Sequence, residues 1–263
     1  MTILFLGDLF GKPGLRILKD RLHSLVDRHR ADFTVVNVEN AADGSGVTPE
    51  IAESILALGA DCLTTGNHAF DRREILDYFT EQPRLLRPLN CAPGTPGKGL
   101  YVGETASGTK VAVMNLIGRV HMPGAADCPF RAADAAVAAG FGGAKVLLVD
   151  MHGEATSEKA AMGAHLDGRA SAVLGTHTHV QTADEAILPR GTAFITDAGM
   201  TGPSSGVIGG DREAALRRFV TQMPGRIPAA TGAARLHGVV VTVEATSGRA
   251  TGIRRLALGE DDA

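Results

Sequence analysis

Short apolar runs rich in Val, Ile and Leu recur along the sequence and alternate with amphipathic stretches. Runs with no polar alternation are typical of strands buried on both faces, and the amphipathic stretches between them suit helices that cross over such a sheet. The alternation therefore predicts an α/β layered fold with parallel strands. The predicted strands span residues 2–6, 33–38, 62–65, 110–116, 146–149, 172–175 and 193–196.

Three amphipathic stretches carry signals for the start of a helix. The stretch 13–29 has leucines on one face and Pro13 near its first turn, where proline is tolerated. Thr48 is followed by Pro49, which predicts an N-cap and a proline at the first helical position. Ser157 is the predicted cap of a third helix, over residues 158–166.

The C-terminal part of the chain predicts a β-hairpin, because strand-like runs at 236–244 and 251–258 flank the turn pair Ser247-Gly248. The fold is therefore expected to have an antiparallel edge. No long charged run or Pro/Ser-rich stretch divides the 263 residues, and a chain of this length can bury a sizeable core. We expect a single domain, residues 1–263.

The composition excludes several classes of protein. A formal net charge of -3 argues against an extended nucleic-acid surface, which needs many Lys and Arg, but leaves a small phosphorylated substrate open. No apolar stretch approaches the roughly 20 residues of a spanning helix, and the apolar run at 2–6 has no basic flank and precedes Asp8, unlike a signal peptide. The three cysteines form no CxxC pair. We expect a cytoplasmic protein without a membrane partner.

Polar side chains follow one predicted strand after another, at the point where each ends. Because the carboxyl ends of parallel strands meet at one edge of a sheet, these groups are expected to converge. Burying them without partners would be costly, whereas carboxylates, amides and imidazoles together are suitable ligands for Mn, Fe or Zn. Two such ions, about 3.5–4 Å apart, could polarise a phosphoryl group. The residues are Asp8, Glu39, Asn40, Asn67, His68, His152, His177 and His179.

Each of these motifs also has a simpler explanation when it is taken alone. Asp8 could be a turn or cap residue, and Gly66-Asn67-His68 could be a tight turn. A His-x-His pair such as His177 and His179 is often not a metal site. Their recurrence at the same topological edge is what turn statistics do not predict.

The order of these motifs resembles a known family. Gly7-Asp8, Glu39-Asn40, Gly66-Asn67-His68, His152 and the run 175–179 are similar to the calcineurin-like metallophosphoesterase signature nearly end to end, and the stretches 7–11, 38–41, 152–159 and 196–203 resemble its bacterial YmdB-type subfamily. The resemblance implies an αββα sandwich and two divalent or mixed-valence metal ions (Fe, Mn or Zn). It also implies phosphodiesterase activity on cyclic nucleotides, including 2′,3′-cyclic AMP.

The resemblance also implies a role for each residue. Asp8, Glu39, Asn40 and His179 would hold the first metal, and Glu39, Asn67, His152 and His177 the second. His68 would be the general acid, although it could instead orient a ligand. The sequence departs from the wider signature in two places: Phe10 stands where a His is usual, and Glu39 replaces the bridging Asp. Asn40 would then supply the compensating oxygen, or could equally cap the following turn.

The function expected on this basis is hydrolysis of a cyclic mononucleotide. A hydroxide activated by the two metals would attack phosphorus in line while His68 protonates the leaving alkoxide. Two alternatives stay open, a phosphomonoesterase and a regulatory module that binds a cyclic nucleotide with little turnover. The expected partner is a small phosphodiester. The sequence leaves open the native metal, the ester bond that is cleaved and the oligomeric state, which could be a homo-oligomer.

Two weaker candidates lie outside the ligand set. Thr156, Ser157 and Lys159 could meet a phosphate at a helix N-terminus, although an ordinary N-cap explains Ser157 as well. The run 204–206, Ser-Ser-Gly, could be a mobile substrate loop, although many flexible turns have the same composition.

Overall fold

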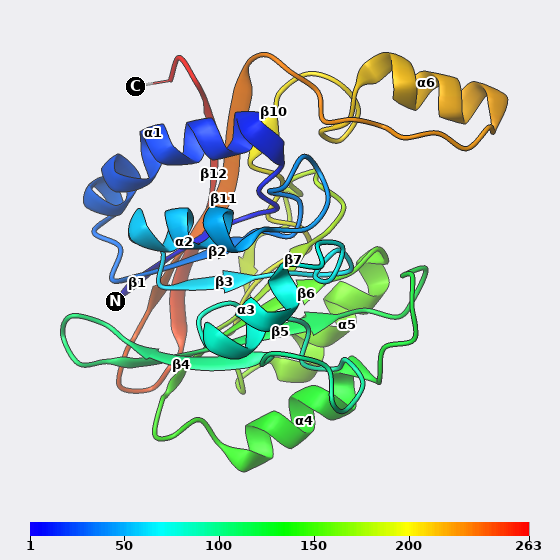
Figure 1. Ribbon diagram of the computed structural model, residues 1–263. Helices are drawn as coiled ribbons and strands as arrows, with labels where there is room; N and C mark the ends of the chain where they lie inside the picture. Colours follow the sequence, from blue (N-terminus) through cyan, green and yellow to red (C-terminus); the bar gives the residue numbers. More distant parts are fainter. Residues whose placement is uncertain (263) are drawn as a thin grey trace.

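Two β-sheets lie face to face at the centre of the protein, in a computed structural model that describes residues 1–262 (Figure 1). The first sheet contains β1 (Thr2–Leu6), β2 (Phe33–Asn37), β3 (Cys62–Thr64), β10 (Gly202–Pro203), β11 (Ala234–Val243) and β12 (Ala250–Gly259). The second contains β4 (Leu100–Glu104), β5 (Lys110–Ile117), β6 (Val146–His152), β7 (Ala172–Thr176), β8 (Ala186–Ile187) and β9 (Ala193–Ile195). All seven predicted strands are present, with ends that differ by up to three residues.

The strands that were expected to be parallel are parallel. In the first sheet the order is β10-β11-β1-β2-β3, with β12 also paired to β11, and β1, β2 and β3 run parallel. In the second sheet the order is β4-β5-β6-β7-β9-β8, and β5, β6, β7 and β9 run parallel. The antiparallel pairs lie toward the edges, and β11 with β12 confirms the predicted hairpin.

Alternation along β1 shows why its sequence is apolar at every position. Ile3 and Phe5 pack into the cluster between the two sheets, beside Val113 of β5, whereas Leu4 and Leu6 face the helices outside. All four side chains are fully buried. A strand covered on both faces has no solvent side on which a polar residue could lie.

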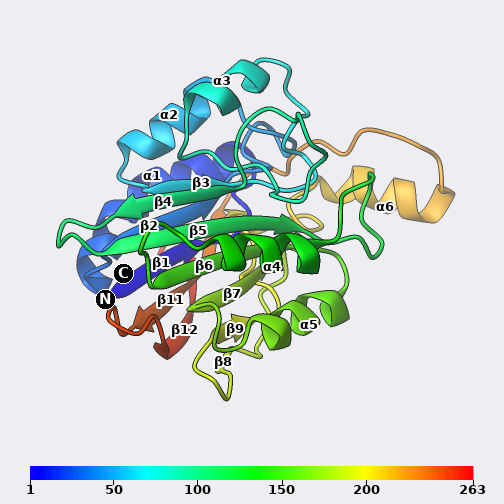
Figure 2. The same cartoon turned by 90° about the horizontal axis from the view of Figure 1, so that it is seen from below.

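Six helices are present in residues 1–262, and five of them pack on the sheets (Figure 2). α1 (Gly11–His29), α2 (Pro49–Ala57) and α3 (Ile75–Glu81) contribute Leu18, Ile55 and Phe79 to the core outside the first sheet. α4 (Pro129–Ala139) and α5 (Thr156–Leu166) cover the second sheet through Ala133 and Met162. The expected αββα sandwich is confirmed. None of these helices is long and apolar enough to cross a membrane.

α6 (Arg212–Thr221) stands away from the sandwich in both views (Figures 1 and 2). The sequence analysis did not predict α6, α3, α4 or the edge strand β4. α6 has little of its surface buried, with only Ala215 fully covered, so the apolar stripe that identifies a core-facing helix is weak in it.

The two predicted helix caps had different outcomes. Thr48 is the N-cap of α2, and its hydroxyl accepts a hydrogen bond from the Ile51 N–H at 3.3 Å, as predicted. The prediction for Ser157 was wrong, because α5 begins at Thr156 after Ala155, and no side chain caps it. Ser157 therefore lies inside the first turn, where its hydroxyl does not accept from the exposed N–H groups.

These two positions form a matched test. Thr48→Ala should lower the free energy of unfolding by about 1 kcal/mol, because the Ile51 N–H loses its acceptor. Ser157→Ala should change it by less than about 0.5 kcal/mol. Urea unfolding followed by circular dichroism measures both. Equal losses in the two variants would contradict the cap assignment.

Candidate metal centre

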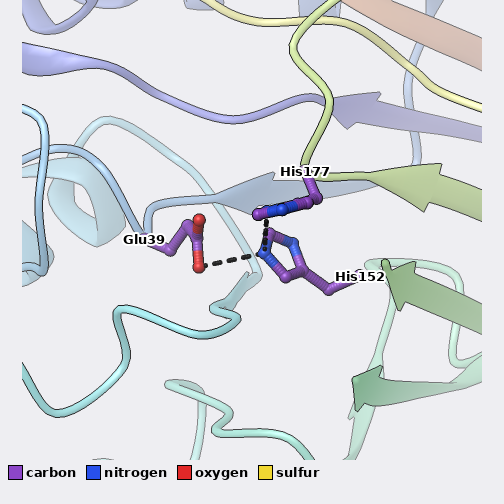
Figure 3. A group of neighbouring side chains, drawn as sticks. All are labelled: Glu39, His152 and His177. Atoms are coloured by element: carbon purple, nitrogen blue, oxygen red, sulfur yellow. Dashed lines mark hydrogen bonds and ion pairs between the residues drawn. The ribbon is translucent and has the colours of Figure 1, made fainter. Parts of the chain in front are cut away.

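Strand ends from both sheets bring the predicted polar residues to one place. Asp8 follows β1, the Glu39-Asn40 pair follows β2, and Asn67 with His68 follows β3. His152 is the last residue of β6, and His177 and His179 follow β7. Glu39, His152 and His177 offer ligand atoms that all lie within 4.8 Å of one another (Figure 3). The contacts described below join six of the eight predicted site residues, and the other two, Asn40 and His179, contact each other and line the same pocket.

The imidazole of His152 is the centre of this cluster. Its Nε2 lies 3.2 Å from Glu39 Oε2 and 3.1 Å from His177 Nδ1 (Figure 3). The same nitrogen lies 3.0 Å from Asn67 Oδ1. The side chain of His152 is fully buried. Three groups from three different strand ends therefore face a single nitrogen atom.

The other nitrogen of His152 fixes where its proton lies. Asp150 Oδ1 accepts the hydroxyl hydrogen of Thr176 at 2.6 Å, and Thr176 Oγ1 lies 2.9 Å from His152 Nδ1. Because the hydroxyl has already donated its only hydrogen, it must accept from an Nδ1–H. In the neutral ring Nε2 then carries a lone pair, which points at the three facing groups.

The facing nitrogen of His177 is also unprotonated. His177 Nε2 lies 3.1 Å from Glu154 Oε2, a carboxylate that can only accept, so the ring proton lies on Nε2 and the lone pair on Nδ1. Burial, with the neighbouring His152, lowers the pKa of His177 to about 3, so this ring stays neutral. When His152 is neutral as well, two nitrogen lone pairs face each other, so this contact requires a proton or a metal ion between the two rings.

The electrostatics of His152 show how strongly a cation is favoured at this point. Burial alone would lower its pKa, but the carboxylates of Glu39, Asp8 and Asp150 together outweigh burial and raise the pKa to about 9. Burial alone would conversely raise the pKa of Glu39, but His152 and His68 together outweigh it and lower that pKa to about 2. A proton or a metal ion satisfies this position, and the donor set of two imidazoles, a carboxylate and an amide is one that binds transition metals.

A second pair of acceptor atoms meets at His179. Its Nδ1 donates to the Ile208 carbonyl at 2.9 Å, so Nε2 carries the lone pair, and Nε2 lies 3.2 Å from Asn40 Oδ1. The amide nitrogen of Asn40 donates to the Gly44 carbonyl, which turns Oδ1 toward the histidine. Burial lowers the pKa of His179, so the ring is not expected to be charged. His179 Nε2 and Asn40 Oδ1 are therefore two acceptor atoms that face each other with no hydrogen between them.

Two buried carboxylate oxygens of the cluster have no hydrogen-bond partner, namely Asp8 Oδ1 and Glu39 Oε1. The second oxygen of Asp8 accepts from the His177 backbone N–H at 2.9 Å. Burial raises the pKa of Asp8 well above its ordinary value, and the carboxylates of Asp197 and Glu39 act in the same direction, against the charge on His152. Free oxygens in a buried cluster complete a donor set suited to metal ions.

The loop between the two histidines has an unusual backbone. His177 and His179 have φ values of 101° and 65°, both in the left-handed region that non-glycine residues rarely adopt. Asp197 holds the residue between them, because its Oδ2 accepts from the Thr178 N–H at 3.0 Å and from the Thr178 hydroxyl at 2.6 Å. Backbone strain at this loop is maintained by a fully buried carboxylate.

Lys159 belongs to this support and not to a phosphate site. Its side chain is 1% exposed, and Nζ donates to Asp197 Oδ2 at 3.0 Å and to the Thr176 carbonyl at 3.3 Å. The suggestion that Lys159 meets a phosphate at the helix N-terminus is therefore wrong. Thr156 and Ser157 are exposed, but they do not line the pocket beside the histidines.

His68 lies at the mouth of the cluster. Its backbone N–H donates to Glu39 Oε2 at 3.2 Å, and its Nδ1 donates to Asp71 Oδ2 at 2.7 Å. The side chain is 35% exposed, so it reaches both the cluster and the solvent. Because Asp71 accepts a hydrogen bond from Nδ1, Nε2 is the ring nitrogen that can exchange a proton with a bound molecule.

A pocket of about 320 Å³ opens over the cluster. The polar part of its lining includes candidate ligands such as Glu39 and His177. The apolar part consists of Phe10, Val207, Ile208 and Ile227. None of the described residues that line the pocket is Lys or Arg. The run 204–206 lines a neighbouring hollow instead, which also contains His179.

Sequence analysis did not assign roles to four residues that support the cluster: Asp150, Thr176, Glu154 and Asp197. Asp150 lies inside β6 and is fully buried, and a lone acid in an otherwise apolar run is a signal that could have identified it. Thr176 and Asp197 occur within the quoted motifs at 175–179 and 196–203. Their hydrogen-bond partners come from other strands, which no local pattern reveals.

Comparisons with known proteins agree with this architecture. The chain is 47% identical over 262 residues to a 2′,3′-cyclic-nucleotide 2′-phosphodiesterase of Bacillus subtilis, with 99% of this chain and 98% of that protein covered. It is 34% identical over 268 residues to a putative phosphatase/phosphodiesterase of Mycoplasma pneumoniae, with 100% and 94% covered.

Solved structures show the same fold. A hypothetical protein from Thermus thermophilus superposes with a TM-score of 0.92 at 42% identity, covering 99% of this chain and 100% of that one. A novel phosphatase from Mycoplasma pneumoniae has a TM-score of 0.93 at 33% identity, covering 100% and 94%. The family model described as YmdB-like protein matches residues 4–256, and the chain therefore belongs to the YmdB-like family.

Proposed function

We propose that this protein is a metal-dependent phosphodiesterase that hydrolyses cyclic mononucleotides of the 2′,3′-cyclic AMP type to monophosphates. One observation carries the proposal: Glu39, Asn67 and His177 all direct acceptor atoms at His152 Nε2, and Asn40 directs one at His179 Nε2, in a buried cluster with free carboxylate oxygens that calls for cations. The substrate class is supported by full-length similarity to a relative named 2′,3′-cyclic-nucleotide 2′-phosphodiesterase.

The two separate groups of facing donors support two metal ions. Asp8, Glu39, Asn40 and His179 would hold one, and Glu39, Asn67, His152 and His177 the other. Glu39 is suited to bridge them, because Oε2 faces His152 while the buried Oε1 has no partner. When bound, two such ions supply an activated hydroxide and neutralise negative charge on the phosphoryl oxygens.

The chain's own residues supply the proton for the leaving group and the room for the substrate. His68 lines the pocket, and Asp71 fixes its ring through Nδ1, so Nε2 is available to protonate the departing alkoxide. The Glu39 carboxylate accepts from the His68 backbone N–H, which keeps the acid beside the cluster.

Charge in the pocket favours a diester over a monoester. A phosphomonoester dianion carries one more negative charge, and sites that prefer it usually add Arg or Lys donors. No Lys or Arg occurs among the described residues that line this pocket, and Lys159 is engaged by Asp197. A monophosphate is thus expected to be a product, not a second substrate.

The proposal is tested by following products over time. Protein reconstituted with Mn(II) should convert 2′,3′-cyclic AMP to a monophosphate that accumulates, and chelation should abolish turnover. Glu39→Ala should lose both bound metal and activity, which controls for a contaminating enzyme. Adenosine and free phosphate as main products would favour the monoesterase. Tight binding of the nucleotide by fully metallated protein without turnover would favour a binding module.

The tautomer of His152 provides a second test, because two threonines donate to the same carboxylate but only one contacts the histidine. Thr176 and Thr64 both donate to Asp150, at 2.6 and 2.5 Å, and both are fully buried. Thr176→Val should weaken metal binding about 10- to 100-fold, because Nδ1–H loses its acceptor and the proton is no longer directed away from Nε2.

The control is Thr64→Val, which should cost stability of about 1–3 kcal/mol without a comparable loss of metal affinity. Thr176→Ser keeps the hydroxyl and should restore binding. Competition titrations of apoprotein against a chelator give the affinities, and urea unfolding gives the stabilities. Similar metal affinities in Thr176→Val and Thr64→Val would rule out the directing role.

His68 should matter for turnover and little for metal content. His68→Ala should lower kcat about 10²- to 10⁴-fold on 2′,3′-cyclic AMP, whose alkoxide is a poor leaving group. The loss should shrink on bis(p-nitrophenyl) phosphate, whose leaving group needs little protonation. Stopped assays with metal analysis of the same samples measure this. Equal losses on both substrates would show that His68 orients a ligand instead.

A further inference from the structure

A tight turn at residues 207–210 forms part of the pocket wall. Val207 and Gly210 exchange two backbone hydrogen bonds, each of 2.9 Å, and the residues between them, Ile208 and Gly209, have φ values of 43° and 93°. Positive φ at both central positions defines a type I′ turn, which favours Asn, Asp or Gly. Ile is a poor choice there, since a β-branched residue with positive φ is strained.

The turn is fixed to the metal cluster through its backbone. The Ile208 carbonyl accepts from His179 Nδ1 at 2.9 Å, so the main chain at this point directs the lone pair of a candidate ligand. Any residue at position 208 would supply that carbonyl. The contact therefore explains the position of the turn but not the identity of its side chain.

The Ile208 side chain has no packing role that would account for it. It is 57% exposed, and it lines the pocket with Val207 and Ile227 on the apolar side. In the free protein an exposed isoleucine on a strained backbone is unfavourable on both counts. Strain of this kind at a site edge points to a contact made only when a ligand is bound.

The ligand must have two unlike ends to match this pocket. Part of the lining presents candidate metal ligands such as Glu39 and His177, and the apolar part presents Phe10 and three aliphatic side chains. A cyclic mononucleotide has a charged phosphodiester at one end and a flat, largely apolar base at the other. The aliphatic wall carries no side-chain hydrogen-bonding group, so it would recognise a base by contact area and not by its edge pattern.

We propose that Ile208, supported by Val207 and Ile227, is the platform on which the nucleobase of the substrate lies. The proposal rests on the proposed phosphodiesterase function and adds the means of selecting the substrate. It assigns to the turn a preference for cyclic phosphates that bear a base, and a stronger preference for purines, which cover more of the wall, than for pyrimidines.

Ile208→Asn separates this role from a structural one, because Asn tolerates positive φ. The variant should gain stability, with a midpoint of thermal unfolding about 2–4 °C higher, since strain is relieved. Its KM for 2′,3′-cyclic AMP should nevertheless rise about five- to tenfold, because the apolar contact is lost. Its KM for ribose 2′,3′-cyclic phosphate, which has no base, should change by less than about twofold, with metal content unaltered.

Val220→Asn is the matched control, since Val220 is 80% exposed on α6 and does not line the pocket. Its KM should equal that of the wild type on both substrates. Steady-state kinetics, differential scanning calorimetry and metal analysis on the same preparations give all the readouts.

The outcomes distinguish this proposal from the one on which it rests. An equal rise of KM on both substrates would show that position 208 acts on the phosphate end, through His179, and would overturn the platform. A changed oligomeric state in Ile208→Asn with unchanged KM would mean that a second copy of the chain covers Ile208. Wild-type protein that uses the base-free substrate as well as 2′,3′-cyclic AMP would remove the base subsite and leave the phosphodiesterase intact. Failure of metallated wild type on both would overturn both proposals.

Discussion

The buried carboxylate of Asp150 connects the two sheets to the candidate metal centre. It lies on β6 of the second sheet, and it accepts from Asn37 of β2 at 2.9 Å and from Thr64 of β3, both in the first sheet. Its other oxygen accepts a hydrogen bond from the Thr176 hydroxyl, which in turn accepts one from His152 Nδ1. Because hydrophobic contacts alone leave sheet-on-sheet register loosely specified, this directional network fixes how the sheets lie and which nitrogen of His152 faces the cluster.

The same logic extends around the site, where each candidate histidine ligand has one nitrogen engaged by an acceptor. The Thr176 hydroxyl accepts a hydrogen bond from His152 Nδ1, and Glu154 accepts one from His177 Nε2. The Ile208 carbonyl accepts one from His179 Nδ1. The opposite nitrogens are thereby left as lone pairs that face the cluster. A centre prepared in this way repels itself when empty of positive charge, and much of the binding energy of a cation would come from relief of that repulsion.

Local patterns were sufficient to predict an α/β layered fold and the convergence of the ligands, because both follow from apolar runs without alternation and a polar residue at the end of each. The αββα arrangement itself was implied by the resemblance to calcineurin-like metallophosphoesterases. It was not sufficient for Asp150 or Asp197, whose meaning depends on partners far away in the chain, such as Asn37 and Thr178. It also failed for Ser157, since a favourable cap residue two positions beyond the actual N-cap, Ala155, cannot be distinguished by type alone. Ile208 escaped notice because its strain is a property of the backbone.

The segment that carries α6 leaves the fold and returns at nearly the same point. Gly210 pairs with Ala229, the Asp211 N–H donates to the Pro228 carbonyl at 2.8 Å, and the Ala230 N–H donates to Gly209 at 2.8 Å, so the root is closed before the helix begins. Once the root is closed, the entropic cost of closing the loop grows only slowly with its length. The number of residues between 211 and 228 can therefore vary at small cost in free energy. Relatives could therefore lengthen, shorten or replace the part of this arm that precedes Ile227, which lines the pocket, and so acquire different binding surfaces beside an unchanged site without altering either sheet.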